Sequence, residues 1–191
     1  MKNWTLRQRI LASFAVIIAI MLLMVVAAFN RLLVIENSGD AVRLDALPGV
    51  FYSSTVRGAW VESYVATQHL LVEGAGRDLT GAEEDQYKEF EDRLQAQIAN
   101  YQKSIFDESD RNDFAQFLQL RERYQLLLNG VLAAYQGDNY ALAQRMFAEQ
   151  LTPAWMEGRK QLNALGAKNK VVADNASDAI QTAVSLSLIH I

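Results

Sequence analysis

The chain has 191 residues, of which 51% are hydrophobic, and its 22 acidic residues outnumber its 18 Lys and Arg residues, giving a net charge of −4. This acidic balance argues against nucleic acid as a partner, because contacts with phosphates require clustered Lys and Arg side chains. The chain contains no cysteine, which excludes disulfide bonds and thiolate chemistry. Only two prolines, Pro48 and Pro153, stand among long segments of helical periodicity, so the composition predicts an all-α protein.

The most apolar stretch is residues 10–29, which contain no charge, proline or glycine. As an α-helix this stretch is ~30 Å long, about the thickness of the hydrocarbon core of a bilayer. Lys2, Arg7 and Arg9 precede it without an acidic residue, so the positive-inside rule places residues 1–9 in the cytoplasm. The length favours an uncleaved transmembrane anchor over a signal peptide, whose apolar part is usually ~7–15 residues; the alternative is cleavage near Val26-Ala27-Ala28.

The first segment beyond the anchor, up to about Glu73, carries two apolar stripes ~100° apart on one predicted helix. We expect the first stripe to face the interior of a helix bundle and the second to face a partner subunit or a ligand. Pro48 is expected to kink or interrupt this helix. The first stripe consists of Leu44, Leu47, Phe51, Ser54, Gly58, Val61, Val65, Gln68 and Val72, and the second of Val50, Ser53, Arg57, Trp60, Tyr64, Thr67 and Leu71.

A second helix is predicted over residues 81–106, after a break at Gly74-Ala75-Gly76. Thr80 and Glu83 have the form of a capping box at its start. Its apolar stripe is Tyr87, Phe90, Leu94, Ile98, Tyr101 and Ile105, and the opposite face, with Lys88, Glu91, Asp92 and Gln95, is expected to be solvated.

Two further helices complete the predicted bundle. One covers residues 111–136, with Arg121 as the polar member of an otherwise apolar stripe. The last is capped by Asp138 or Asn139, is bent at Pro153 and continues to the end of the chain. Its stripe beyond the proline is Leu162, Leu165, Asn169, Val172, Ala176, Ala179 and Ala183.

The uncharged C-terminal residues read as a second membrane span. We expect residues 34–183 to form a periplasmic sensor domain and residues 184–191 to start a truncated second transmembrane helix. Residues 187–191, Ser-Leu-Ile-His-Ile, resemble translated sequencing-adapter read-through, so the chain is expected to be a fragment. The predicted fold is an all-α, membrane-anchored, antiparallel up-down four-helix bundle whose long first and fourth helices continue into transmembrane spans.

Catalysis is not supported by the residues present. His69 is the only histidine in the folded part, and no serine stands in a Gly-x-Ser-x-Gly setting. Adjacent acids at residues 83–85 and 107–108 lie at predicted helix starts, where carboxylates favour the positive end of the helix dipole. We therefore expect no enzyme activity, no cofactor and no metal site.

Three side chains of the second stripe suggest a binding site. Arg57, Trp60 and Tyr64 are three and four residues apart on one helix face. A guanidinium beside aromatic rings can bind a carboxylate with two hydrogen bonds and stack on a flat apolar body. The alternative is that Arg57 pairs with an acid across a dimer seam that Trp60 and Tyr64 fill.

The arrangement resembles the N-terminal half of a bacterial methyl-accepting chemotaxis protein, whose exported part is a four-helix-bundle ligand-binding domain. The segments 44–48 (Leu-Asp-Ala-Leu-Pro), 57–73 and 136–143 (Gln-Gly-Asp-Asn-Tyr-Ala-Leu-Ala) carry the resemblance. It implies a homodimer in the bacterial inner membrane that binds a small molecule in the periplasm, near the dimer interface between the first and fourth helices. Motion of the fourth helix would then control a cytoplasmic chemotaxis kinase and its coupling protein, through a C-terminal part that is absent from this chain.

The resemblance also extends the candidate site. Amino-acid receptors of the family use several arginines on the first helix and a threonine early in the fourth, where this chain has only Arg57 and Thr152. Together with Trp60, Tyr64 and Trp155, this set suits an aromatic or other small carboxylate better than an α-amino acid.

Two other functional classes remain open. The same sensor can precede a histidine kinase or a cyclic-dinucleotide cyclase, because a fold does not determine the output attached to it. The chain could also be a membrane-anchored structural bundle that binds no ligand.

Overall fold

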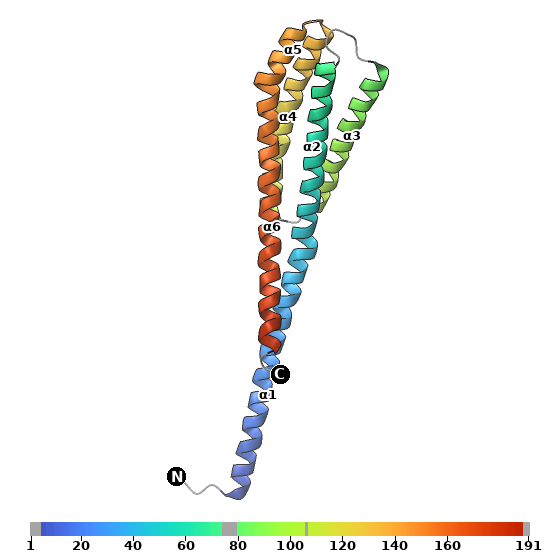
Figure 1. The fold of residues 1–191 in the computed structure, drawn as a ribbon. Helices are drawn as coiled ribbons and strands as arrows, with labels where there is room; N and C mark the ends of the chain where they lie inside the picture. The colour runs from blue at the N-terminus through green and yellow to red at the C-terminus, as the bar shows by residue number, and fades with distance from the viewer. Residues whose placement is uncertain (1–4, 74–79, 106, 189–191) are drawn as a thin grey trace. The chain divides into compact units, whose positions relative to one another are not determined.

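The structure is a computed structural model that describes residues 5–73, 80–105 and 107–188 (Figure 1). Every regular element within these ranges is a helix, which confirms the predicted all-α fold. Two of the elements, η1 and η2, are short π-helices. The elements in chain order are α1 (Leu6–Ala41), η1 (Val42–Ala46), α2 (Leu47–Glu73), α3 (Gly81–Ser104), α4 (Glu108–Gln136), α5 (Tyr140–Met146), η2 (Phe147–Leu151) and α6 (Thr152–Leu188).

The chain divides into two compact units. The anchor unit comprises residues 1–42 and 174–191, and the bundle unit comprises residues 43–173. The predicted sensor domain, residues 34–183, is thus shared between the two units. Helix α6 contributes to both without a break in the described residues.

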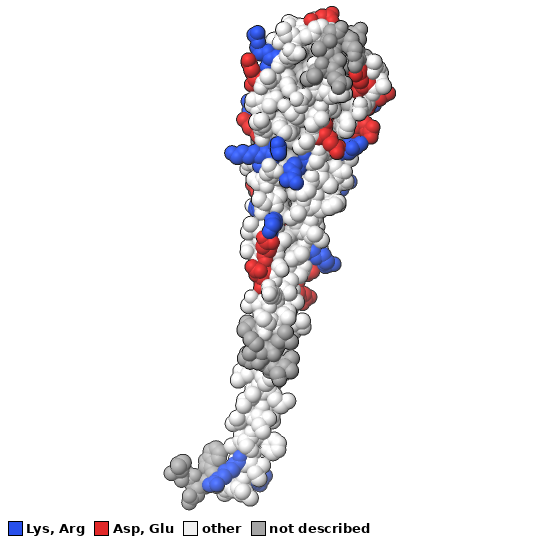
Figure 2. All heavy atoms as spheres, in the orientation of Figure 1, with Lys and Arg blue, Asp and Glu red and all other residues white. Residues whose placement is uncertain are grey.

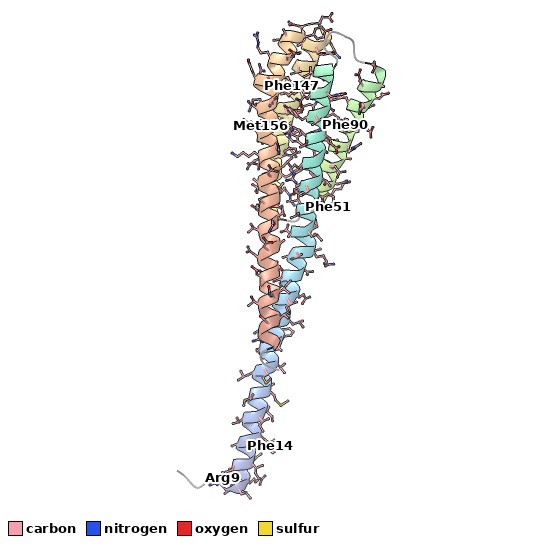
Figure 3. The ribbon with its side chains drawn as sticks, viewed as in Figure 1. Arg9, Phe14, Phe51, Phe90, Phe147 and Met156 are labelled. Carbon is pink, nitrogen blue, oxygen red and sulfur yellow. The ribbon has the colours of Figure 1, made fainter. Side chains whose placement is uncertain are left out.

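The anchor unit is built on α1, which contains no buried residue. Among the described residues, the helical stretch Leu6–His69 is the one helix long and apolar enough to cross a membrane, and its most apolar window has a mean hydropathy of 3.1. Figure 2 shows an uncharged surface along the lower part of α1, with basic side chains at its N-terminal end, where Figure 3 labels Arg9. The helix starts at a capping box formed by Thr5 and Gln8. The predicted second span, residues 184–191, lies partly outside the described residues.

In the bundle unit, α2, α3, α4 and the α5–η2–α6 segment run antiparallel around one core (Figure 1). The apolar stripes predicted for the second, third and fourth helices are confirmed, because their central members are buried. The largest fully buried side chains are Trp60, Tyr101, Tyr124, Phe114, Phe117, Leu94, Ile98, Leu128, Leu151, Leu162, Leu165 and Val56.

The assignment of the two stripes on the first bundle helix is wrong. The stripe expected inside is largely exposed on α2 and η1, with Leu47 at 63%, Phe51 at 58% and Val65 at 53% exposure. Apart from the exposed Arg57, the stripe expected to face a partner or ligand packs inside the bundle, where Trp60 is 1% exposed and Thr67 is fully buried. Figure 3 labels Phe51 on α2.

The hydropathy of the sequence does not identify the buried face of α2, because this face is rich in small polar residues. Thr67 donates its hydroxyl to the carbonyl of Ser63, and Ser53 donates to the carbonyl of Val50. A hydroxyl satisfied by its own helix loses little on burial, and the small side chain lets neighbouring helices approach closely. Hydropathy favours Leu47 and Phe51 for the interior, whereas close packing favours the Ser and Thr face.

Both prolines follow a π-helix. Pro48 and Pro153 are each the second residue of the α-helix that follows η1 or η2. Proline lacks an N–H, and its ring clashes with the carbonyl four residues earlier in a regular helix. In a π-helix each N–H donates to the carbonyl five residues earlier instead of four. Accordingly, the N–H of Thr152 donates to the carbonyl of Phe147. The predicted interruptions at the two prolines are confirmed. Each interruption is a π-helical turn, and an α-helix continues directly after it.

The helix caps agree closely with the sequence. Thr80 and Glu83 form the predicted capping box, and Asn139 caps α5. Asp138 instead adopts a φ of 58°, a left-handed conformation that Asp tolerates better than most residues. Helix α4 begins earlier than predicted because Asp107 accepts hydrogen bonds from the first turn. Helix α3 ends at Ser104 rather than at residue 106, and the predicted break at residues 74–76 lies outside the described residues.

Candidate functional site

The seam between α2 and α6 contains most of the residues predicted to bind ligand. Trp60 donates its indole N–H to the carbonyl of Trp155 at 3.1 Å, and Trp155 donates its own to the carbonyl of Trp60 at 3.3 Å. Both side chains are buried, at 1% and 7% exposure. Each indole therefore satisfies its polar group inside the bundle while placing its apolar body in the core.

A glycine on α6 allows this approach. A Cβ atom at Gly158 would lie 2.9 Å from Cζ2 of Trp60. The indole is held on its other sides by Tyr124 and Phe117, whose ring centroids lie 4.5 Å and 5.5 Å away. Trp60 thus occupies a space that requires glycine at position 158.

The upper part of the seam is joined by a hydroxyl pair. The Tyr64 hydroxyl lies 2.9 Å from Oγ1 of Thr152, and Thr152 can donate to the carbonyl of Phe147 at 2.9 Å. The Tyr64 ring stacks on Trp155, with centroids 4.2 Å apart and planes 15° apart. It also stacks on Phe147, which Figure 3 labels at η2. These contacts join α2 to the π-helical turn before Pro153.

Arg57 lies on the exposed side of the seam. Its Nη1 donates to Oδ1 of Asn163 on α6 at 3.1 Å. The guanidinium that lies over an aromatic ring of this seam is that of Arg159, 5.4 Å from the centroid of Trp155. Arg57 is therefore positioned by an amide of the same chain.

The five predicted residues all lie on the α2–α6 seam but do not line one open ligand site. Trp60, Tyr64, Thr152 and Trp155 form a packed contact between the two helices, whereas Arg57 is exposed beside it. Trp60 and Tyr64 pack on α6 and do not form an open surface. Ligand binding by Trp60, Tyr64, Thr152 and Trp155 and carboxylate binding by Arg57 stay predictions.

A polar layer between α2, α3 and α4 was missed in the sequence. Ser63 donates to Oε1 of Glu91 at 2.7 Å, and Arg121 lies 3.7 Å from Oε2 of the same carboxylate. Glu91 was expected on a solvated face, yet its side chain is only 19% exposed. The helical spacing places Arg121 in an otherwise apolar, buried stripe. A charged side chain at such a position indicates that an acidic residue of a neighbouring helix lies close to it.

Buried polar atoms surround this ion pair. Within the described residues, the Nε of Arg121 is buried without a hydrogen bond partner. Burial is the main cause that raises the pKa of Tyr87 and Tyr124, and the negative charge of Glu91 adds to it, while hydrogen bonding by Gln125 to Tyr87 and by Thr67 to Tyr124 opposes it. A buried unpaired donor lowers the stability of a core, so Arg121 is a weak point between the three helices.

A charged cluster lies at the other end of the bundle unit. Lys168 lies 3.1 Å from Oδ1 of Asp110 and 2.8 Å from Oδ2 of Asp113. Asp110 is only 5% exposed. Burial, followed by the charges of Asp110 and Asp107, raises the pKa of Asp45 in η1, while Lys168 opposes this shift. The single positive charge of Lys168 therefore cannot neutralise the carboxylates of Asp45, Asp110 and Asp113 together.

A cavity opens on a different face of α2, between α2 and α3. Its volume is about 380 Å³, within the range of small-ligand sites. Its lining is mainly apolar, with Val61, Val65 and Phe90, and includes the carboxylates of Glu62 and Glu83. No group of three or more His, Asp or Glu side chains in the described part of the chain could hold a metal ion.

The fold defines a helical module that carries an anchor helix, and the comparisons with known proteins give its family. A family model described as a four-helix bundle sensory module for signal transduction matches residues 3–184. The chain therefore belongs to this family and corresponds to the N-terminal sensor region of a methyl-accepting chemotaxis protein. No curated protein and no solved structure matches the chain.

Proposed function

We propose that the chain is the sensing half of a chemoreceptor in the bacterial inner membrane, with its bundle unit in the periplasm. The family match over residues 3–184 is the observation that carries the proposal. The basic residues before the anchor helix support a cytoplasmic N-terminus. The module senses and does not catalyse, and its signal passes to a chemotaxis kinase and coupling protein through a C-terminal part that follows the second span.

The α2–α6 seam supports a route for the signal. Helix α6 carries Thr152 and Trp155 in the bundle unit and continues to Leu188 in the anchor unit. A ligand that prefers one arrangement of the seam shifts α6 by as much as its affinities for the two arrangements differ. The reciprocal Trp60–Trp155 hydrogen bonds keep the resting register, because any axial displacement of α6 breaks both.

The receptor works as a homodimer in this proposal. The exposed apolar stripe on η1 and α2 supports a partner surface in the bundle unit, since its residues at three- and four-residue steps suit a second helix. Its most exposed large members are Leu44, Leu47, Phe51 and Val65. This stripe replaces Trp60 and Tyr64 as the expected seam between subunits.

The first ligand class in the proposal is a small carboxylate. Arg57 is exposed, bonds Asn163 through Nη1, and keeps further N–H groups that a carboxylate can use. Because Arg57 projects from the same helix as the apolar stripe, a site there would be completed at the dimer surface.

A chimera tests the proposed function. Residues 1–183 joined in helical phase to the second transmembrane span and cytoplasmic kinase-control part of a known chemoreceptor should change kinase output when membrane-impermeant small molecules are added outside. A matched chimera with Trp155→Ala, which removes the indole that donates to the carbonyl of Trp60 and stacks on Tyr64, should lose this coupling. No response to any compound in a broad panel, from a chimera that is correctly inserted and dimeric, would contradict the proposal.

A further inference from the structure

The cavity between α2 and α3 lies apart from Arg57 and from the α2–α6 seam. It is lined by side chains of only these two helices, and its apolar surface comes from Val61, Val65 and Ala66 on α2 and from Tyr87 and Phe90 on α3. Figure 3 labels Phe90 on α3. A volume of about 380 Å³ holds an apolar body the size of one aromatic ring with a short chain.

The formal charge of the described lining residues is negative. Glu62 and Glu83 line the cavity together with His69 and Gln86, and no Lys or Arg is among its described lining residues. Figure 2 shows acidic side chains gathered along α3. Glu83 is positioned by the capping box, because its Oε2 accepts from the N–H and the hydroxyl of Thr80, both at 2.8 Å.

The guanidinium of Arg93 does not neutralise this negative charge. Arg93 contacts Oε2 of Glu62 at 3.0 Å and Oε1 of Glu89 at 2.8 Å. Two carboxylates share one positive charge, so the group keeps a net charge of −1. The hydrogen bond to Arg93 uses Oε2 of Glu62, and its Oε1 can accept a hydrogen bond from a second donor.

We propose that this cavity is a second ligand site of the sensor, for a small organic ammonium ion with an apolar body. The body packs on Val65, Tyr87 and Phe90, and the ammonium group donates to Glu62, whose side chain is 47% exposed. The aromatic rings add cation–π attraction when the positive charge lies over a ring face. A carboxylate ligand of the same shape is repelled by the carboxylates of Glu62 and Glu83.

The test uses the full chain in lipid nanodiscs, titrated calorimetrically with three probes of the same shape: phenethylammonium, 2-phenylethanol and 3-phenylpropionate. Empty nanodiscs correct for partition into lipid. The ammonium ion should bind, the alcohol should bind at least about tenfold more weakly through loss of a charge-assisted hydrogen bond, and the carboxylate should not bind. Equal affinity for the ammonium ion and the alcohol, or no binding of either, overturns the proposal.

Paired variants separate the cavity from the ion-pair network around it. Glu62→Gln should weaken phenethylammonium about tenfold to a hundredfold. Glu89→Gln removes the other partner of Arg93 without touching the cavity, so affinity should not change. Ala66→Phe should fill the cavity and abolish binding while the melting temperature stays near that of the parent chain. An equal loss in the Glu62 and Glu89 variants, or retained binding in the filled variant, would show that the ammonium ion binds elsewhere.

The outcome is distinguishable from that of the proposed receptor function. If the chimera responds to other compounds while phenethylammonium fails to bind, the ammonium site is wrong and the receptor stands. If phenethylammonium binds with the expected variant pattern while the chimera responds to nothing, the site stands and the receptor function is wrong.

Discussion

Gly158→Ala tests whether the packing of Trp60 against α6 controls the stability of the bundle unit. Alanine is favoured over glycine inside a helix by about 0.8–1.0 kcal/mol. Against this, the new Cβ would lie 2.9 Å from Cζ2, 3.2 Å from Cε2 and 3.3 Å from Nε1 of Trp60. Overpacking of this kind costs about 1–3 kcal/mol. We expect a net loss of up to about 2 kcal/mol in the free energy of unfolding.

The steric cost should be near its upper limit, because Trp60 has little room to move. Its indole N–H is bonded to the carbonyl of Trp155, and the rings of Tyr124 and Phe117 pack on it from the core. Rotating the indole away from Gly158 would break that hydrogen bond and disturb both aromatic contacts.

Gly58→Ala on α2 is the matched control. No atom of the same chain lies within 4 Å of a Cβ built at Gly58, so this variant, measured on the monomeric chain, should keep the full helix-propensity gain of about 1 kcal/mol. The two variants should then differ by about 1–3 kcal/mol, or about 4–12 °C in melting temperature. Near-ultraviolet circular dichroism of the full chain in one detergent would follow loss of aromatic packing without interference from the helix inside the micelle. If Gly158→Ala stabilises as much as Gly58→Ala, the seam geometry described above is wrong.

Four further predictions follow from particular contacts. Asp45→Asn should raise the free energy of unfolding at neutral pH, because a carboxyl whose folded pKa is raised loses stability as pH increases through that pKa; the advantage should vanish near pH 4, and urea unfolding at several pH values checks it. Tyr64→Phe and Thr152→Val should each cost about 1 kcal/mol, and the double variant should cost less than their sum, as a double-mutant cycle would measure. Phe51→Lys should weaken self-association in sedimentation experiments without changing the melting temperature, since this side chain is 58% exposed; an unchanged dimer would exclude the stripe as the seam between subunits. Arg57→Ala should weaken small-carboxylate binding about tenfold to a hundredfold with little effect on stability, and a large stability loss without a binding effect would make Arg57 structural.

The sequence by itself determined the elements of this protein. The apolar run at residues 10–29, the capping box at Thr80 and Glu83, the cap at Asn139 and the interruptions at the two prolines are local features. Each is decided by residues within one or two helical turns, so periodicity and capping chemistry were sufficient to identify them. The family also followed from the order and lengths of these elements.

Only the tertiary structure decided which face of α2 is inside. Both stripes have helical spacing, and hydropathy ranks Leu47 and Phe51 above Ser53 and Thr67. The packed structure reverses this order, because a small hydroxyl bonded to its own helix can be buried at low cost, whereas one glycine on α6 leaves space for the indole of Trp60.

The predicted ligand site on α2 is split into a buried part and an exposed part, again because of how α2 packs on its neighbours. Arg57, Trp60 and Tyr64 share a stripe in sequence, yet burial depends on what the partner helix presents at each level. Opposite Trp60 and Tyr64, α6 offers Gly158, Trp155 and Thr152, which close over the aromatic rings; opposite Arg57 it offers the exposed amide of Asn163. The pairing of two distant helices sets these neighbours, and no spacing within either helix contains that information.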